Sequence, residues 1–330
     1  MKKILILTVL SLMTILTIAS NNGDCDHHYK FEEQKVVERI FDVEALPELE
    51  MEGIYSDFII TTWDEPQIDF KVKITVKSDK EKAVKYLIDI INVEFVQEGD
   101  LVRARTVFEN KTNRSFNASV SIKYYVKVPE DVRMDIETRY GDIIVETVKK
   151  DFKAEVKYGS LTAGNLLADN EIEIKYGDLS IAYAKNLELD MKYSDGKINK
   201  VEFIDADIEY CDITATEVFR GVFENKYSDI RIEKIKDLKS KNRYSDMKVT
   251  LDGSEPDVDI DASYSDIRLK INEKTSFRYD IRVNYGDIIC GEIMGSNAGR
   301  TSDGRIAGRH GEGSSGNIRA ELQYGDIRIE

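Results

Sequence analysis

The fold of this chain is set by a recurring motif that is clearest in residues 176–214, which read YGDLSIAYAKNLELDMKYSDGKINKVEFIDADIEYCDIT. A tyrosine is followed there by a small residue and then by aspartate. The tyrosines of the motif, from a total of 17 in the chain, are Tyr55, Tyr140, Tyr158, Tyr176, Tyr193, Tyr210, Tyr227, Tyr244, Tyr264, Tyr285 and Tyr324. Between Tyr140 and Tyr285 successive copies start 17 to 21 residues apart. This short period predicts stacked repeats, each too small to bury its apolar side alone.

Within each repeat, apolar and polar residues alternate in two short runs. In the repeat that begins at Tyr176, the apolar residues are Leu179, Ile181, Ala184, Leu187, Leu189 and Met191. A period of two indicates strands. We therefore predict a mainly β fold, a single-stranded parallel β-solenoid (a right-handed β-helix) with 17–18 residues per coil. Antiparallel hairpins are the alternative, but they would not place an identical corner at every second turn.

The tyrosines occupy the corners of the predicted coils. Tyr193 continues the parity of Leu189 and Met191, so the motif tyrosines should point inward as a buried ladder. The glycine or serine that follows should turn the corner, because these residues tolerate unusual backbone angles or bond locally. Exposed tyrosines would instead suggest a platform on which sugars stack.

The N-terminus predicts export. Lys2 and Lys3 precede an apolar run that ends near Ile18, and the small residues Ala19 and Ser20 follow. This run is too short for a membrane span and is typical of a signal peptide. We predict a signal peptide over 1–20 and a mature chain without a transmembrane segment. Its destination is the periplasm, the outer cell surface or the medium.

Cys25 raises the question of a lipoprotein, but Asp24 beside it fits lipidation poorly. The three cysteines, Cys25, Cys211 and Cys290, cannot all pair, so no disulfide framework is predicted. Asp24, Cys25, Asp26, His27 and His28 are metal-binding residue types, but they fall in a predicted flexible tail over 21–35.

The remaining chain divides into two predicted parts. Residues 36–139 form a β-rich N-terminal cap, because an open solenoid end exposes strand edges. The cap includes one amphipathic helix, with a capping box at Ser78–Glu81 and an apolar stripe from Ala83 to Ile91. Residues 140–330 form the solenoid repeats, with a loop rich in Gly, Ser and Arg over 295–316.

The net charge of the chain argues against one class of partner, nucleic acids. The chain of 330 residues carries a formal net charge of −15, which disfavours nucleic-acid binding. Residues 311–316 match GxGxxG, but a strand-like segment follows where a dinucleotide site needs a helix. Arg300, Arg305 and Arg309 form a local basic cluster that would suit an anion, but solvated loop charges are the favoured explanation.

The chain resembles the bacterial putative adhesin family of envelope proteins, related to the auto-transporter adhesin head and the GIN-domain-like β-helical proteins. The resemblance covers residues 36–330 and rests on the tyrosine repeats, on residues 59–64 (IITTWD) and on the glycine-rich turn before Tyr324. It implies a β-helical fold on an exported protein and an adhesive role. It carries over no catalytic residue.

The repeated aspartates are the candidate site. They should line one edge of the solenoid, about 5 Å apart, where carboxylates repel one another. Either each carboxylate accepts backbone N–H bonds at its corner, or a row of cations such as calcium binds there. The members of this predicted cation ladder are Asp142, Asp178, Asp195, Asp212, Asp229, Asp246, Asp266 and Asp287. No catalytic residue, no cofactor-binding residue and no cofactor other than calcium is predicted.

These patterns predict an exported, non-enzymatic, adhesin-like monomer that binds an extracellular glycan or an envelope protein through its solenoid surface. A structural scaffold of the envelope is one alternative. The other is a β-helical enzyme that cleaves polysaccharides, but residues 140–245 contain almost no insertions from which to build a catalytic groove.

Overall fold

The computed structural model describes residues 29–330, except for 45, 110–116, 273 and 313–314. These residues form two compact units that divide between residues 149 and 150, whereas the sequence suggested a boundary at 139/140. The predicted signal peptide, Cys25 and the Asp24–His28 group lie outside the described residues. The predicted flexible tail over 21–35 is wrong where it can be examined, because strand β1 (Phe31–Asp42) pairs antiparallel with β4.

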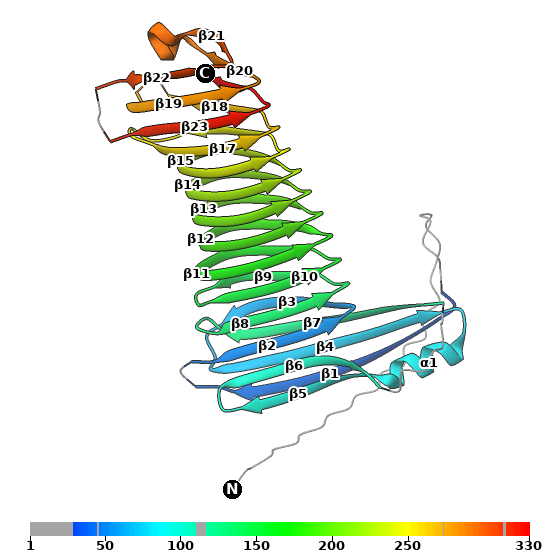
Figure 1. Ribbon diagram of the computed structural model, residues 1–330. Coiled ribbons are helices and arrows are strands. Elements are labelled where there is room, and N and C mark those ends of the chain that lie inside the picture. Colours follow the sequence, from blue (N-terminus) through cyan, green and yellow to red (C-terminus); the bar gives the residue numbers. More distant parts are fainter. Residues whose placement is uncertain (1–28, 45, 110–116, 273, 313–314) are drawn as a thin grey trace. The chain divides into compact units, whose positions relative to one another are not determined.

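The first unit contains two stacked coils. β2 pairs in parallel with β8, and β3 pairs in parallel with β9 (Figure 1). The bounds are β2 Glu48–Ile54, β3 Ser56–Trp63, β8 Arg133–Arg139 and β9 Ile143–Val148. Tyr55 and Tyr140 stand at the matching corners of these coils. The Tyr140 coil therefore belongs to the first unit because it pairs with residues far earlier in the chain.

The chain between these two coils widens the first unit. β4 pairs antiparallel with β1 and β7, and β5 pairs antiparallel with β6. The inserted elements are β4 Gln67–Ser78, α1 Glu81–Ile90, β5 Ile91–Glu98, β6 Leu101–Phe108 and β7 Ala118–Pro129. The predicted amphipathic helix is present as α1. The predicted capping box is absent: Lys80 is the N-cap without a side-chain bond, and the Ser78 hydroxyl donates to the Asn117 carbonyl at 2.7 Å.

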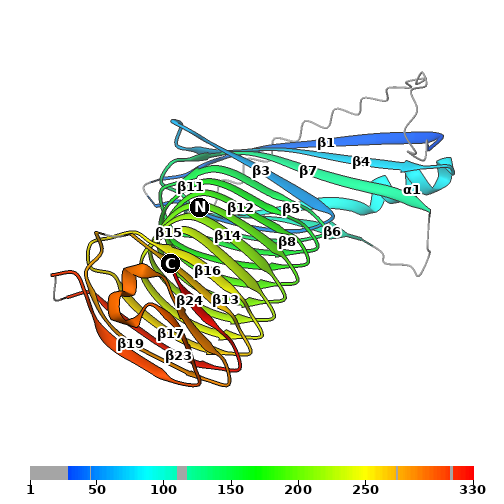
Figure 2. The ribbon, with the colours of Figure 1, turned by 90° about the horizontal axis from the view of Figure 1, so that it is seen from above.

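The second unit is a stack of parallel strands, nested coil on coil in Figures 1 and 2. The register runs residue by residue through neighbouring coils, as in Leu189, Ala206 and Phe223. The stacked elements are β10 Phe152–Lys157, β11 Leu161–Lys175, β12 Asp178–Lys192, β13 Asp195–Glu209, β14 Asp212–Lys226, β15 Asp229–Arg243, β16 Met247–Leu251, β17 Asp257–Ser263 and β18 Ile267–Ile271. The mainly β class with many parallel strands is confirmed, and the right-handed sense stays a prediction.

The C-terminal elements do not stack in chain order. β23 lies between β17 and β19, and β24 lies between β18 and β20, all in parallel. β22 and β21 then pair antiparallel with β19 and β20, so the predicted loop over 295–316 contains two strands. The bounds are β19 Phe277–Asn284, β20 Asp287–Cys290, η1 Glu292–Asn297, β21 Gly299–Ser302, β22 Arg305–His310, β23 Asn317–Gln323 and β24 Ile327–Ile329.

Candidate functional site

The motif tyrosines point outward, contrary to the sequence prediction. Each adopts a left-handed backbone conformation, with φ between 53° and 62°. This kink shifts the inward parity by one residue, so Met191 and Ser194 are buried while Tyr193 between them is 51% exposed. Parity alone could not reveal the shift, because side chains other than glycine rarely adopt such angles.

In the second unit the exposed rings form a continuous ladder. Successive ring centroids are 4.7–5.1 Å apart, and the planes differ by 2–9°. The order along the stack is Tyr158, Tyr176, Tyr193, Tyr210, Tyr227, Tyr244, Tyr264, Tyr324 and Tyr285. In the first unit Tyr55 stacks on Tyr140 in the same way, at 5.3 Å.

The ladder exposes ring edges and hydroxyl groups rather than ring faces. Every interior ring has a neighbour on both faces, so a sugar cannot stack there. The pKa of Tyr210 is raised, first by desolvation and then by the adjacent Tyr227 and Tyr193 phenols. Because its ring faces are covered, the ladder does not support the sugar platform that exposure first suggests.

Replacing one ring should separate stacking from backbone strain. Tyr210→Ala removes two stacking contacts and should lower the free energy of unfolding by about 2 kcal/mol. Tyr210→Gly should lower it by about 1 kcal/mol less, because glycine adopts the positive φ without penalty. Urea denaturation measures both variants, with Tyr125→Ala as an exposed control outside the ladder. Equal stability of all three variants and the parent chain would contradict a stabilising role for the stack.

The small residue after each tyrosine faces inward and is small for reasons of space. A Cβ on Gly177 would lie 1.7 Å from the Gly159 carbonyl oxygen, and one on Gly325 would lie 2.1 Å from that of Ser265. Where serine occupies the position, its hydroxyl links two coils. Ser228 donates to the Lys226 carbonyl at 2.8 Å and accepts the Cys211 N–H at 3.0 Å. Cys211 and Cys290 are buried, and burial raises the pKa of both thiols.

The aspartates of the second unit line up in one row. Asp178, Asp195, Asp212 and Asp229 are in register on neighbouring strands. From Asp195 onward, most neighbours in the row are joined by the same contact. Asp195 accepts the Asp212 N–H at 3.3 Å and Asp246 accepts the Asp266 N–H at 2.9 Å, whereas the Asp229 N–H donates to the Cys211 carbonyl at 3.1 Å. The same contact places Asp326, which the predicted ladder omitted, between Asp266 and Asp287. In the first unit Asp57 accepts the Asp142 N–H at 3.2 Å.

These contacts relieve part of the repulsion within the row, but they run between coils rather than within a corner. Among the described residues, no group of three or more His, Cys, Asp or Glu side chains is arranged to hold a metal ion. Cation binding by the row therefore stays a prediction that only titration with calcium can test.

A groove of about 490 Å³ runs beside this row in the second unit. Carboxylates form one wall, long cationic side chains form the other, and the intervening backbone forms the floor. The lining includes Asp212, Thr214, Asp229, Arg231, Asp246, Lys248, Asp266, Arg268, Ile289, Asp326 and Arg328. The cationic column was not predicted from the sequence, although arginine or lysine stands two residues after Asp229, Asp246, Asp266 and Asp326.

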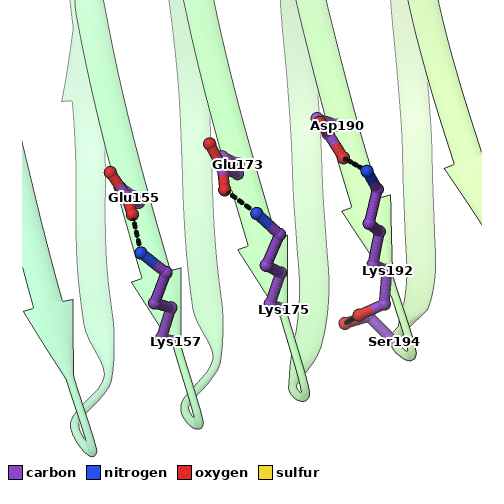
Figure 3. A network of polar contacts seen from close by, with 7 residues as sticks. All are labelled: Glu155, Lys157, Glu173, Lys175, Asp190, Lys192 and Ser194. Atoms are coloured by element: carbon purple, nitrogen blue, oxygen red, sulfur yellow. Dashed lines mark hydrogen bonds and ion pairs between the residues drawn. The ribbon is translucent and has the colours of Figure 1, made fainter.

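A different part of the same unit neutralises its charges locally. Lysines pair with carboxylates two residues earlier on the same strand: Lys157 with Glu155, Lys175 with Glu173, and Lys192 with Asp190 (Figure 3). The Lys175 ammonium lowers the pKa of Glu173, whereas burial raises that of Asp190. Same-strand pairing at this spacing is therefore available to the fold.

Two of the three arginines in the predicted basic cluster form ion pairs within the C-terminal end of the second unit. Arg300 and Ser302 of β21 bond to the Asp287 carboxylate and hold its pKa below the usual range. Arg305 of β22 forms a bidentate pair with Asp280 at 2.6 and 2.7 Å. These ion pairs fasten the antiparallel strands to β19 and β20, so the two arginines offer no anion site.

The described part of the chain contains no helix with the length and apolarity that crossing a membrane requires.

No protein with a curated description matches the sequence. Solved structures with partial likeness include a putative lipid binding protein from Parabacteroides distasonis, with 11% identity, a TM-score of 0.42, and coverage of 89% of this chain and 96% of that one. Putative adhesins from Bacteroides fragilis and Parabacteroides merdae have 12% and 10% identity, with TM-scores of 0.32 and 0.37. They cover 90% and 89% of this chain and 97% and 96% of their own.

At these TM-scores the likeness transfers neither fold nor function. The adhesin-head family suggested by the sequence is also not confirmed. A family model described as Toastrack DUF4097 matches residues 67–330, from the insertion of the first unit through every coil of the second. Because this match spans most of the sequence, the chain belongs to the Toastrack DUF4097 family.

Proposed function

We propose that this chain is an exported, non-catalytic, adhesin-like binding protein that holds an extended glycan along the groove of its second unit. The observation that carries the proposal is the groove itself, whose volume of about 490 Å³ falls in the range of ligand sites. Export rests on the N-terminal sequence, in which Lys2 and Lys3 precede the apolar run.

The repetition of the groove favours an extended ligand. Asp229, Asp246 and Asp266 occupy equivalent places on successive coils, so the same contact is offered again at about 4.8 Å intervals. A linear polymer with a repeating unit can use all of these contacts at once, whereas a compact ligand uses only a few.

The uniformity of the row favours binding over catalysis. Acid–base catalysis by two carboxylates needs environments that separate their pKa values. Here Asp195, Asp229 and Asp246 accept the same kind of backbone N–H bond. Asp287 differs, because Arg300 and Ser302 bond to its carboxylate, but it does not line the groove.

A glycan array probed with the purified chain, with and without calcium, tests the proposal. We expect retention of linear oligosaccharides without release of sugar. Thr214→Trp should weaken binding about tenfold, because the bulky ring obstructs the groove at an exposed lining position. Thr162→Trp is the matched control, since Thr162 lies in the same column of side chains but outside the groove.

Other outcomes would redirect the assignment. Release of shortened sugars would contradict the non-catalytic role. Equal loss of binding in both tryptophan variants would place the ligand elsewhere. Calcium-dependent binding that Asp229→Asn abolishes would assign the aspartate row as a cation site. A silent array together with capture of an envelope protein would contradict the glycan.

A further inference from the structure

We infer that the groove selects a linear anionic glycan, whose acidic groups lie on its cationic wall and whose hydroxyls lie on its carboxylate wall. This inference rests on the proposed function and names the class of ligand. The cationic wall consists of Arg231, Lys248, Arg268 and Arg328. The inference follows from the spacing, the lack of neutralising partners and the opposite polarity of the two walls.

The four cations occupy one continuous column. Arg231 is in register with Lys248, Lys248 with Arg268, and Arg268 with Arg328. Neighbouring strands are about 4.8 Å apart, and like charges directly opposite one another are unfavourable. In a chain with a net charge of −15, such a run of positive charge is a local exception that an anionic ligand would relieve.

Three of these four cations are not neutralised by neighbouring carboxylates. Among the described residues, Arg231, Lys248 and Arg268 form no ion pair, and Arg328 has one loose contact of 3.7 Å with Glu330. Elsewhere in the unit, residues with the same spacing do pair, as Lys175 does with Glu173 (Figure 3). The groove therefore keeps its cations available although an aspartate stands two residues before each of them in the sequence.

The carboxylate wall explains why the ligand is not a simple polyanion. Asp229 and Asp246 each accept a hydrogen bond from a backbone N–H of the next coil through one carboxylate oxygen. The other oxygen of each carboxylate can accept further hydrogen bonds. Sugar hydroxyls supply such donors beside each acidic group. A polyanion without hydroxyls would meet only repulsion there.

The cationic column also has a defined length. The column ends at the neutral residues Thr214 and Ile289, so affinity should grow with chain length until the glycan spans four coils.

Calorimetric titration with polygalacturonate in the presence of a chelator tests this inference. The parent chain should bind the acid and not its fully methyl-esterified form. The triple variant Arg231→Ala, Lys248→Ala and Arg268→Ala should bind about a hundredfold more weakly. The control triple variant is Lys226→Ala, Lys239→Ala and Arg243→Ala. It removes the same charge from exposed positions of the same unit outside the groove and should bind as the parent does.

Each alternative result has a distinct meaning. Binding of dextran sulfate alone, with the same loss in the first triple variant, supports the cationic column and assigns sulfate rather than uronate as its anion. Equal binding of the acid and the ester, or equal behaviour of the two triple variants, overturns the inference and leaves a neutral glycan in the groove. Preference for polyglutamate overturns the glycan class. If none of these polymers binds but an array glycan does, the inference fails and the proposed function survives.

Discussion

Deletion of residues 317–330 should undo two coils of the second unit instead of one. β23 and β24 supply the parallel partners of both the preceding coil and the β19–β20 coil. Without them, residues 277–290 lose their parallel strand partners and the ring stack of Tyr285 on Tyr324. The core also loses Ile318, Leu322 and Ile327, all of which are buried.

Hydrogen exchange and urea denaturation check this expectation. The amides of 277–290 should be protected in the full chain and exchange freely after the deletion. A chain that ends at residue 275 is the matched control, because it exposes the same coil, 257–271. The two truncated chains should unfold at the same urea concentration. Retained protection of 277–290 in the 317–330 deletion would mean that this segment docks directly on β17 and β18.

Gly177→Ala should be among the most destabilising single substitutions at the corners of the second unit. The new methyl group would lie 1.7 Å from the carbonyl oxygen of Gly159, which is backbone and cannot rotate away. The two coils must separate or the corner must change its conformation. Overpacking of this kind costs about 3 kcal/mol, which urea denaturation would show as a lower midpoint with an unchanged slope.

Gly196→Ala is the control for this substitution. Its Cβ would meet the Ile213 and Met191 side chains at 3.3 Å, and both can adjust by small rotations. We expect a loss of less than about 1 kcal/mol. If the two alanine variants were equally stable, the close approach of backbones at the corners would not limit the choice of residue there.

The architecture could be predicted because the tyrosine motif recurs in the sequence at a nearly regular spacing. Alternation from Leu179 to Met191 predicted strands, and the constant step between tyrosines predicted coils that stack in register. The tyrosine orientation was not predictable from parity. A single left-handed residue at each corner shifts the alternation by one position. Nothing in the sequence around Tyr193 indicates that this tyrosine adopts a positive φ.

The alignment of the aspartates could be predicted only in part, for a similar reason. The aspartate row follows from the motif, but its order does not. The 39-residue step from Tyr285 to Tyr324 suggested a final coil, whereas Asp326 lies between Asp266 and Asp287. Pairing between segments far apart in sequence is decided by which strand edge is open, and local pattern does not encode this choice.

The position of the last strands also constrains the order of folding. A chain emerges from the ribosome with its N-terminus first, and a repeat array can grow by adding coils to an existing end. Such growth can proceed through 257–271 but cannot then add 277–290, because the surface that receives this segment is made by residues synthesised later. Residues 277–330 must therefore dock together once residues 317–330 have been synthesised. Until then the last coil, 257–271, leaves its strand edges unpaired. A partner that binds these edges can do so only before residues 277–330 have docked.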